Sequence, residues 1–237
     1  MDSGTASPAS GGGRRQPVRD VRRRLARGGP PWTRDRANDF DTVTVPERDC
    51  DALRDLLIAE GAETVVEVGL AYGSSALAIG EALVAVDGAR PLHVIIDPFQ
   101  ATEWSDVGWR LLRSAGLDTI ARLILEPSST ALPTLVTEGL SADAAFVDGS
   151  HRFHEVFVDL YFLRKLVRPG GIIVLDDHHW PSVRTAEHYF EVNMGWRVVP
   201  GALDAGTVVP ATGSPRLRAL RLPSPSFEPD FDRFQPF

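Results

Sequence analysis

Short apolar runs alternate with stretches of helical hydrophobic spacing along most of the chain after residue 61. The apolar runs are continuous rather than alternating, which is typical of strands that helices cover on both faces of a sheet. They predict strands at residues 64–68, 92–96, 122–125, 144–147 and 172–175. The stretches between them predict helices near residues 74–86, 104–115, 129–138, 153–167 and 182–193. Repeated strand–helix units of this kind indicate an α/β fold with a doubly wound, mostly parallel sheet.

The segments that flank these units extend the pattern. Before the first strand, Thr44 or a neighbour is expected to cap a helix that has Pro46 in its first turn and ends at Gly61. After the last parallel strand, residues 196–199 and 217–222 predict two closing strands joined by a Gly/Pro-rich loop.

Composition divides the chain into three segments. The main domain, residues 38–222, follows an Arg-rich N-terminal arm, residues 1–37, and precedes an aromatic and acidic tail, residues 223–237. Residues 1–13 are small, polar and Gly/Ser-rich, so we expect disorder there. The rest of the arm is expected to be weakly helical, because its apolar residues recur at helical spacing: Val18, Val21 and Leu25.

The net charge of −7 is unevenly distributed. The arm holds nine Arg and three Asp, a charge of +6, so the remaining residues carry −13. An acidic body argues against a nucleic-acid partner, which usually demands a basic face. No apolar run reaches the roughly 18 residues of a membrane helix, and no secretory segment is evident, so we expect a cytoplasmic protein. The single cysteine, Cys50, excludes an internal disulfide and a thiolate metal cluster.

A glycine-containing turn follows the first predicted strand. Ligands of doubly wound sheets bind beyond the carboxyl ends of the strands. Glycine lets the backbone turn tightly and approach a ligand, and the N–H groups of the next helix suit a carboxylate. The spacing is G-x-x-x-G rather than the G-x-G-x-x-G of dinucleotide sites. The turn supplies these candidate cofactor-binding residues: Glu67, Gly69, Tyr72, Gly73, Ser74 and Ser75.

An acid closes the second predicted strand. Asp97 stands directly after the apolar run 92–96. At that place a carboxylate is positioned to accept both ribose hydroxyls of a nucleoside. Together with the glycine turn, Asp97 indicates nucleoside recognition.

Acidic residues also close the last two parallel strands. Because neighbouring strand ends meet, we expect Asp148 to lie close to Asp176 and Asp177. Three carboxylates repel one another unless a cation or a proton offsets them, and oxygen ligands suit Mg²⁺ or Mn²⁺. His151, one helical turn beyond Asp148, would stand beside such an ion as a general base. A tight Asp-Gly turn and helix capping by the paired Asp would explain the same residues without a metal.

Taken together, these motifs resemble those of class I S-adenosylmethionine-dependent methyltransferases. Within that class they are similar to small-molecule O-methyltransferases of the macrolide-sugar and catechol types, over roughly residues 45–222. The resemblance implies a seven-stranded Rossmann-like sheet and S-adenosyl-L-methionine as cofactor. It also implies a small-molecule hydroxyl acceptor of secondary metabolism, and a homodimer.

The resemblance assigns roles around the cofactor. It implies that Gly69 and its neighbours line the methionine end, that Glu67 supports this loop, and that Asp97 holds the ribose. It also implies that Ser128 contacts the adenine, although Pro127 stands where an acidic residue is common.

The resemblance also assigns roles in catalysis. Asp148, Asp176 and Asp177 fall on the family's metal positions, implying Mg²⁺ or another divalent ion. The third position is often Asn in catechol-type enzymes, so Asp177 makes the site more anionic. The catechol-type base is a lysine three residues beyond the first metal Asp, where this chain has His151.

Three alternatives stay open at this point. A metal-free methyltransferase would use His178 or His179 as the base, with the Asp residues orienting it. A non-haem iron oxygenase would use two His and one carboxylate, but would leave the glycine turn and Asp97 without a role. A non-catalytic binding module would act through the Arg-rich arm.

Overall fold

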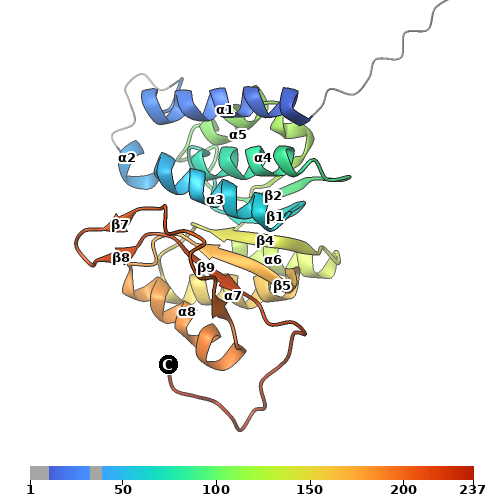
Figure 1. The fold of residues 1–237 in the computed structure, drawn as a ribbon, viewed down its shortest axis with the longest axis vertical. Helices are drawn as coiled ribbons and strands as arrows, with labels where there is room; N and C mark the ends of the chain where they lie inside the picture. The colour runs from blue at the N-terminus through green and yellow to red at the C-terminus, as the bar shows by residue number, and fades with distance from the viewer. Residues whose placement is uncertain (1–10, 33–38) are drawn as a thin grey trace, which may run out of the picture.

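A seven-stranded sheet with helices on both faces forms the centre of the molecule (Figure 1). The computed structural model describes residues 11–32 and 39–237. The first five strands are parallel, whereas β9 runs antiparallel to both β5 and β6. In spatial order the strands are β3 (Ala121–Ile124), β2 (Leu92–Ile96), β1 (Thr64–Val68), β4 (Ala142–Val147), β5 (Val167–Leu175), β9 (Arg218–Arg221) and β6 (Arg197–Val198). The predicted α/β class with a Rossmann-like, mostly parallel sheet is confirmed.

Two helical layers cover the sheet (Figure 1). One layer holds α1 (Gly11–Gly28), α3 (Glu47–Ala59), α4 (Ser74–Val86) and α5 (Val107–Ser114). The other holds α6 (Ser128–Thr137), α7 (Phe153–Leu166) and α8 (Pro181–Met194). The smaller elements are α2 (Phe40–Val43), a 3₁₀ turn η1 (Leu117–Thr119) and the hairpin of β7 (Val208–Val209) with β8 (Ser214–Pro215).

The central strands are mainly apolar because each face of the sheet packs against one of these layers. On β1, Val65 packs with the α3 and α4 side chains, whereas Val66 packs with those of α6, α7 and α8. Both side chains are fully buried. The continuous apolar runs therefore reflect two-sided burial, as the pattern predicted.

Most predicted boundaries agree with the structure, and the differences have local causes. β5 begins at Val167, five residues before the predicted start, because Val167 pairs with Ala142 across a shift in register. α5 begins only at Val107 because the two preceding residues, Ser105 and Asp106, have positive φ. Thr44 does not cap α3; its hydroxyl donates to the Phe40 carbonyl, and Pro46 takes the N-cap position.

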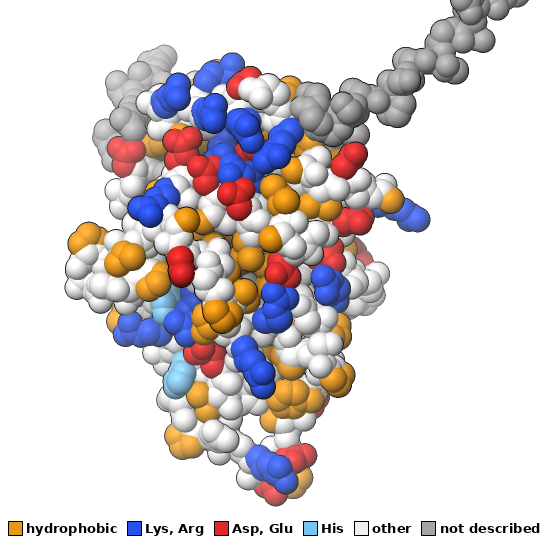
Figure 2. Space-filling view, viewed as in Figure 1, with side chains coloured by type: hydrophobic (Ala, Val, Ile, Leu, Met, Phe, Trp, Pro, Cys, Tyr) orange, Lys and Arg blue, Asp and Glu red, His pale blue; other side chains and the backbone are white. Residues whose placement is uncertain are grey.

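The Arg-rich arm contributes a docked helix. The apolar stripe of α1 is buried, and it packs against Ala76 and Leu77 of α4; its members are Val18, Val21 and Leu25. Figure 2 shows basic side chains gathered over this helix, next to acidic ones. Disorder was predicted for residues 1–13, but Gly11–Gly13 form the first turn of α1, and residues 1–10 lie outside the described residues. The division into arm and main domain stays a prediction. No helix in the described part of the chain is long and apolar enough to cross a bilayer.

A buried carboxylate anchors α1. Glu81 on α4 is fully buried and accepts hydrogen bonds from Arg15 at 3.2 Å, Arg19 at 3.0 Å and Arg22 at 3.1 Å. Arg22 is itself 4% exposed and also binds Asp51 at 2.6 Å. The surrounding guanidinium groups outweigh the effect of burial and lower the pKa of Glu81.

Substitution of this anchor is expected to destabilise the protein. Glu81→Gln removes the charge that offsets a buried Arg22, and breaking a buried ion pair typically costs about 3–5 kcal/mol. Urea denaturation followed by circular dichroism measures the change. The control is Glu138→Gln, which removes an exposed pair with Arg122 and should leave the midpoint unchanged. Equal midpoints for the two variants would contradict the anchoring role.

Candidate active site

The turn between β1 and α4 can be made only with glycine at Gly69. This residue has φ +97°, and a Cβ there would lie 2.1 Å from the backbone oxygen of Asp148. Gly73 caps α4 with φ +85°. Fully buried Glu67 accepts a hydrogen bond from the Ser75 hydroxyl at 2.6 Å, joining the strand to the first turn of the helix. The turn therefore lies directly against the end of β4.

Asp97 fastens this turn. Its Oδ2 accepts the N–H groups of Leu70 at 3.1 Å and Ala71 at 2.9 Å, and the Gln100 side-chain amide at 2.9 Å. Its Oδ1 accepts the N–H of Phe99 at 2.8 Å. The structure thus gives Asp97 a role in holding the loop, and the ribose contact stays a prediction.

The other predicted cofactor residues lie around the turn. Tyr72 is buried between Phe40 and Trp104, and its hydroxyl donates to Asp39 at 3.0 Å. Burial raises the pKa of Tyr72 to about 12, and Asp39 adds to the effect.

Ser128 begins α6 beside Asp159 on α7, whose Oδ1 is buried without a hydrogen-bond partner among the described residues. Burial raises the pKa of Asp159 to about 6, although Ser128 opposes the shift. The predicted contact of Ser128 with adenine stays a prediction.

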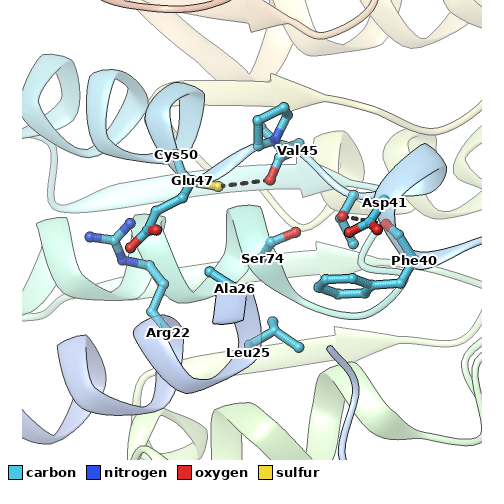
Figure 3. A pocket seen from close by; sticks show the side chains of 11 residues that line it. Arg22, Leu25, Ala26, Phe40, Asp41, Val45, Glu47, Cys50 and Ser74 are labelled. Atoms are coloured by element: carbon cyan, nitrogen blue, oxygen red, sulfur yellow. Dashed lines mark hydrogen bonds between the residues drawn. The ribbon is translucent and has the colours of Figure 1, made fainter. Parts of the chain in front are cut away.

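A cavity of about 190 Å³ adjoins the start of α4 (Figure 3). Ser74 lines it together with Arg22 and Leu25 from α1, Phe40 from α2 and the Cys50 thiol from α3. Burial raises the pKa of Cys50 far above its ordinary value, so this thiol is unreactive.

Three predicted catalytic residues converge beyond β4 and β5. Asp148, His151 and Asp177 each offer a ligand atom, and these atoms lie within 4.8 Å of one another. Nε2 of His151 lies 2.9 Å from Oδ2 of Asp177. The His151 ring stacks on Trp180 with 5.7 Å between ring centroids and 12° between planes. The imidazole is therefore oriented by a carboxylate at one edge and an indole against its face.

Asp176 is not part of that group, because Arg216 binds it. Nε and Nη2 of Arg216 donate to the two carboxylate oxygens at 2.8 and 2.7 Å. Arg216 Nη2 also lies 3.6 Å from Oδ1 of Asp177. Sequence reasoning missed Arg216, because it lies in the Gly/Pro-rich loop and no motif or periodicity distinguishes it there.

The three carboxylates, His151 and Arg216 shift one another's pKa values. Burial, reinforced by Asp176 and Asp177, raises the pKa of Asp148 well above its ordinary value. Burial also raises the pKa of Asp176 although Arg216 opposes it. For Asp177 the hydrogen bond from His151 and the charge of Arg216 outweigh burial, so its pKa is lowered. The same hydrogen bond raises the pKa of His151.

The two alternative candidates for the base, His178 and His179, lie in different surroundings. His178 is 5% exposed, and its Nδ1 lies 2.7 Å from Oε2 of Glu187 on α8. Glu187 in turn pairs with Arg218 of β9 at 2.5 Å. His178 is therefore part of a buried ionic network rather than of the convergent group. His179 lies nearer, with Nδ1 3.6 Å from Oδ1 of Asp177.

The predicted all-oxygen Mg²⁺ set does not fit this arrangement. Asp176 would have to leave its two hydrogen bonds with Arg216 to coordinate an ion. The set that does converge contains two carboxylates and an imidazole, whereas Mg²⁺ prefers oxygen ligands. An ion held there would also occupy the lone pair that His151 needs as a base.

The fold and this strand-end site resemble those of class I methyltransferases, and comparisons with known proteins agree in the likeness. Residues 66–178 match the family described as a methyltransferase domain. An Arabidopsis thaliana relative, named as a caffeoyl-CoA O-methyltransferase, is 29% identical over 142 residues, or 60% of this chain. The match spans 58% of that relative.

Solved structures share the fold. An O-methyltransferase from Bacillus cereus with SAH has a TM-score of 0.62 at 15% identity, covering 87% of this chain and 90% of that one. The O-methyltransferase TomG of Streptomyces achromogenes with SAM has a TM-score of 0.61 at 18% identity, covering 92% and 90%. The resemblance to class I S-adenosylmethionine-dependent O-methyltransferases is thus confirmed as a likeness of sequence and fold.

The close contact at Gly69 generates a prediction about cofactor affinity. Gly69→Ala forces its Cβ into the Asp148 carbonyl, and overpacking of this kind costs about 1–3 kcal/mol. We expect calorimetry to show S-adenosylhomocysteine bound about tenfold more weakly or worse.

The matched control for this variant is Gly61→Ala. Gly61 also has positive φ, +61°, but nothing lies within 4 Å of its Cβ position. It should lose some stability and keep its affinity for S-adenosylhomocysteine. Full affinity in Gly69→Ala would show that the turn does not shape the cofactor site.

Proposed function

We propose that this protein transfers a methyl group from S-adenosyl-L-methionine to a hydroxyl of a small, natural-product-like molecule. The observation that carries the proposal is the contact of the glycine turn with the backbone of Asp148. It brings the predicted cofactor loop and the His151–Asp177 pair to one edge of the sheet. The family match over residues 66–178 and the O-methyltransferase relative support the reaction class.

The cofactor supplies an electrophilic methyl group on a sulfonium, which is transferred in line. The chain's own part is to position the acceptor and remove its proton. Nε2 of His151 faces Asp177, so Nδ1 is the nitrogen left to accept the hydroxyl proton. Asp177 then stabilises the imidazolium that forms, as a carboxylate does for a histidine base in other enzymes. Trp180 holds the ring plane by stacking.

Assistance by a divalent ion is a separate part of the sequence prediction and stays one. Asp148, His151 and Asp177 are close enough to share an ion. Such an ion would compete with proton transfer for the imidazole, so the proposed mechanism contains no step through it. The predicted homodimer and cytoplasmic location likewise stay predictions.

The alternatives from other classes gain no support. An iron oxygenase needs two histidines and one carboxylate as ligands. Both His151 and His179 border Asp177, but the group of convergent ligand atoms found among residues 11–32 and 39–237 includes His151 and not His179. A module that acts only through α1 would leave the glycine turn, Asp97 and the His151–Asp177 pair without a task.

Cofactor binding is the first test of the proposal. Titration calorimetry should show one S-adenosylhomocysteine per chain, and a radiolabelled methyl group should pass from S-adenosylmethionine to a member of a panel of phenols and sugar hydroxyls. Absence of binding at millimolar cofactor would refute the proposal. Binding without transfer to any hydroxyl, but with transfer to amines, would overturn the O-methylation part alone.

The histidine base makes a prediction about pH. The hydrogen bond to Asp177 raises the pKa of His151, so the neutral imidazole prevails only above that raised value. The acidic limb of the kcat/KM profile should therefore lie above pH 6.5, and Asp177→Asn should move it to lower pH. His151→Gln should lower kcat by about 10²–10⁴-fold.

Two other histidines serve as comparisons for His151. His154→Gln alters an exposed side chain at the start of α7 and should change neither kcat nor the profile. His178→Gln should reduce stability without moving the acidic limb, because His178 pairs with buried Glu187. A limb that moves with His178 instead of His151 would transfer the base to the alternative residue.

A further inference from the structure

Arg216 lies beside the acidic cluster that Asp148, Asp176 and Asp177 form. Its side chain is 14% exposed, and it forms a two-bonded fork with Asp176, which is fully buried. One of the same nitrogens lies 3.6 Å from Asp177. A planar guanidinium matches the two oxygens of a carboxylate, so this fork is both strong and directional.

Backbone contacts hold Arg216 in this place. It follows the β7–β8 hairpin directly, and its N–H donates to the Thr207 carbonyl at 2.9 Å. Its own carbonyl accepts the N–H of His178 at 3.0 Å. Thr207 is tied in turn to buried Asp49 of α3, which accepts its N–H at 2.7 Å and its hydroxyl at 2.5 Å. The hairpin that precedes Arg216 is therefore held at both ends, at Thr207 and at Arg216 itself, and this fixes the position of the guanidinium.

The position of Arg216 affects the charge balance of the acidic cluster. Asp148, Asp176 and Asp177 gather beyond two neighbouring strands, and the repulsion within such a cluster must be offset by a cation or a proton. Arg216 supplies a permanent positive charge and occupies both Asp176 oxygens. An ion coordinated by Asp176 would need the same oxygens. An ion held by Asp148, His151 and Asp177 would meet the fixed positive charge of Arg216, which lies 3.6 Å from Oδ1 of Asp177.

We propose that Arg216 takes the place of the divalent ion, so that methyl transfer by this protein needs no metal. In this arrangement Arg216 is a positioning residue. It holds Asp176 by the fork and attracts Oδ1 of Asp177, which leaves Oδ2 of Asp177 directed at His151. The catalytic consequence rests on the proposed function, whereas the exclusion of an ion concerns the folded chain alone.

Ion binding tests the exclusion without any assay of activity. Mn²⁺ titrated into the wild-type protein should give no calorimetric heat and no change in its electron paramagnetic resonance signal up to millimolar concentration. Arg216→Met frees the three carboxylates and should bind Mn²⁺ measurably. A wild-type protein that binds one Mn²⁺ at micromolar concentration would overturn the proposal, and so would an Arg216→Met variant that folds and binds none.

Two further variants separate charge from structure. Arg216→Lys keeps the positive charge and should still exclude Mn²⁺, which provides a test even where Arg216→Met folds poorly. The control is Arg221→Met, which breaks a similar fork, at 2.9 and 2.6 Å, between β9 and Glu60 of the loop after α3. Arg221→Met should gain no ion site. Mn²⁺ binding by Arg216→Lys or Arg221→Met would show that general loosening, rather than loss of this cation, creates the site.

Activity completes the test. Wild-type methyl transfer should survive excess EDTA unchanged. Arg216→Met should lower kcat about 10–100-fold, the loss typical for removal of a residue that orients a functional side chain. Added Mn²⁺ should restore part of that loss. Abolition of wild-type activity by EDTA would overturn the proposal. Failure to bind S-adenosylhomocysteine would refute the proposed function instead and leave the Mn²⁺ result to stand by itself.

Discussion

The site depends on the close approach of two backbones, at the turn after β1 and at the end of β4. Gly69 lies so near the Asp148 carbonyl that a single added carbon would overlap it. The N–H of Asp148 donates to the Val68 carbonyl at 2.8 Å, so the two strand ends are also joined by a hydrogen bond. Because the turn is pressed against this strand end, the loop that Asp97 fastens and the loop that carries His151 share one edge of the sheet.

A second constraint is the pairing of buried carboxylates with arginines. Glu81 receives three arginines of α1, Asp176 receives Arg216, and Glu187 receives Arg218. A buried carboxylate without such a partner would be unstable or protonated. These pairs connect segments far apart in the chain, so they hold the N-terminal helix and the closing strands on the same core as the site.

Within the site, Asp176 and Asp177 are adjacent in sequence but have different charged partners and different roles. Asp176 is bound by Arg216 on both oxygens, whereas Asp177 divides its contacts between Arg216 and His151. Burial and the neighbouring charges of Asp176 and Asp177 raise the pKa of Asp148. One adjacent pair of carboxylates thus serves as a structural anchor and as the partner of the base.

The sequence by itself determined the sheet, the glycine turn and the place of the acidic residues. β1 and β2 were predicted to the residue, because two-sided burial favours a mainly apolar run in each strand. Gly69 was recognised as a turn because a residue without a Cβ is most useful where backbones approach closely. These features depend on local chemistry, which the order of residues carries directly.

The tertiary structure alone decided which of the polar residues meet. Arg216 is about forty residues from Asp176 in the chain and reaches it only because β9 pairs antiparallel to β5. Asp177 has φ +50°, and the structure points its carboxylate toward His151 but the next side chain, His178, toward Glu187. The spacing from Asp148 favoured His151 as the base but left His178 open as an alternative. Their surroundings are set by the rotation of the backbone at one residue and by strand pairing, and both are properties of the folded chain.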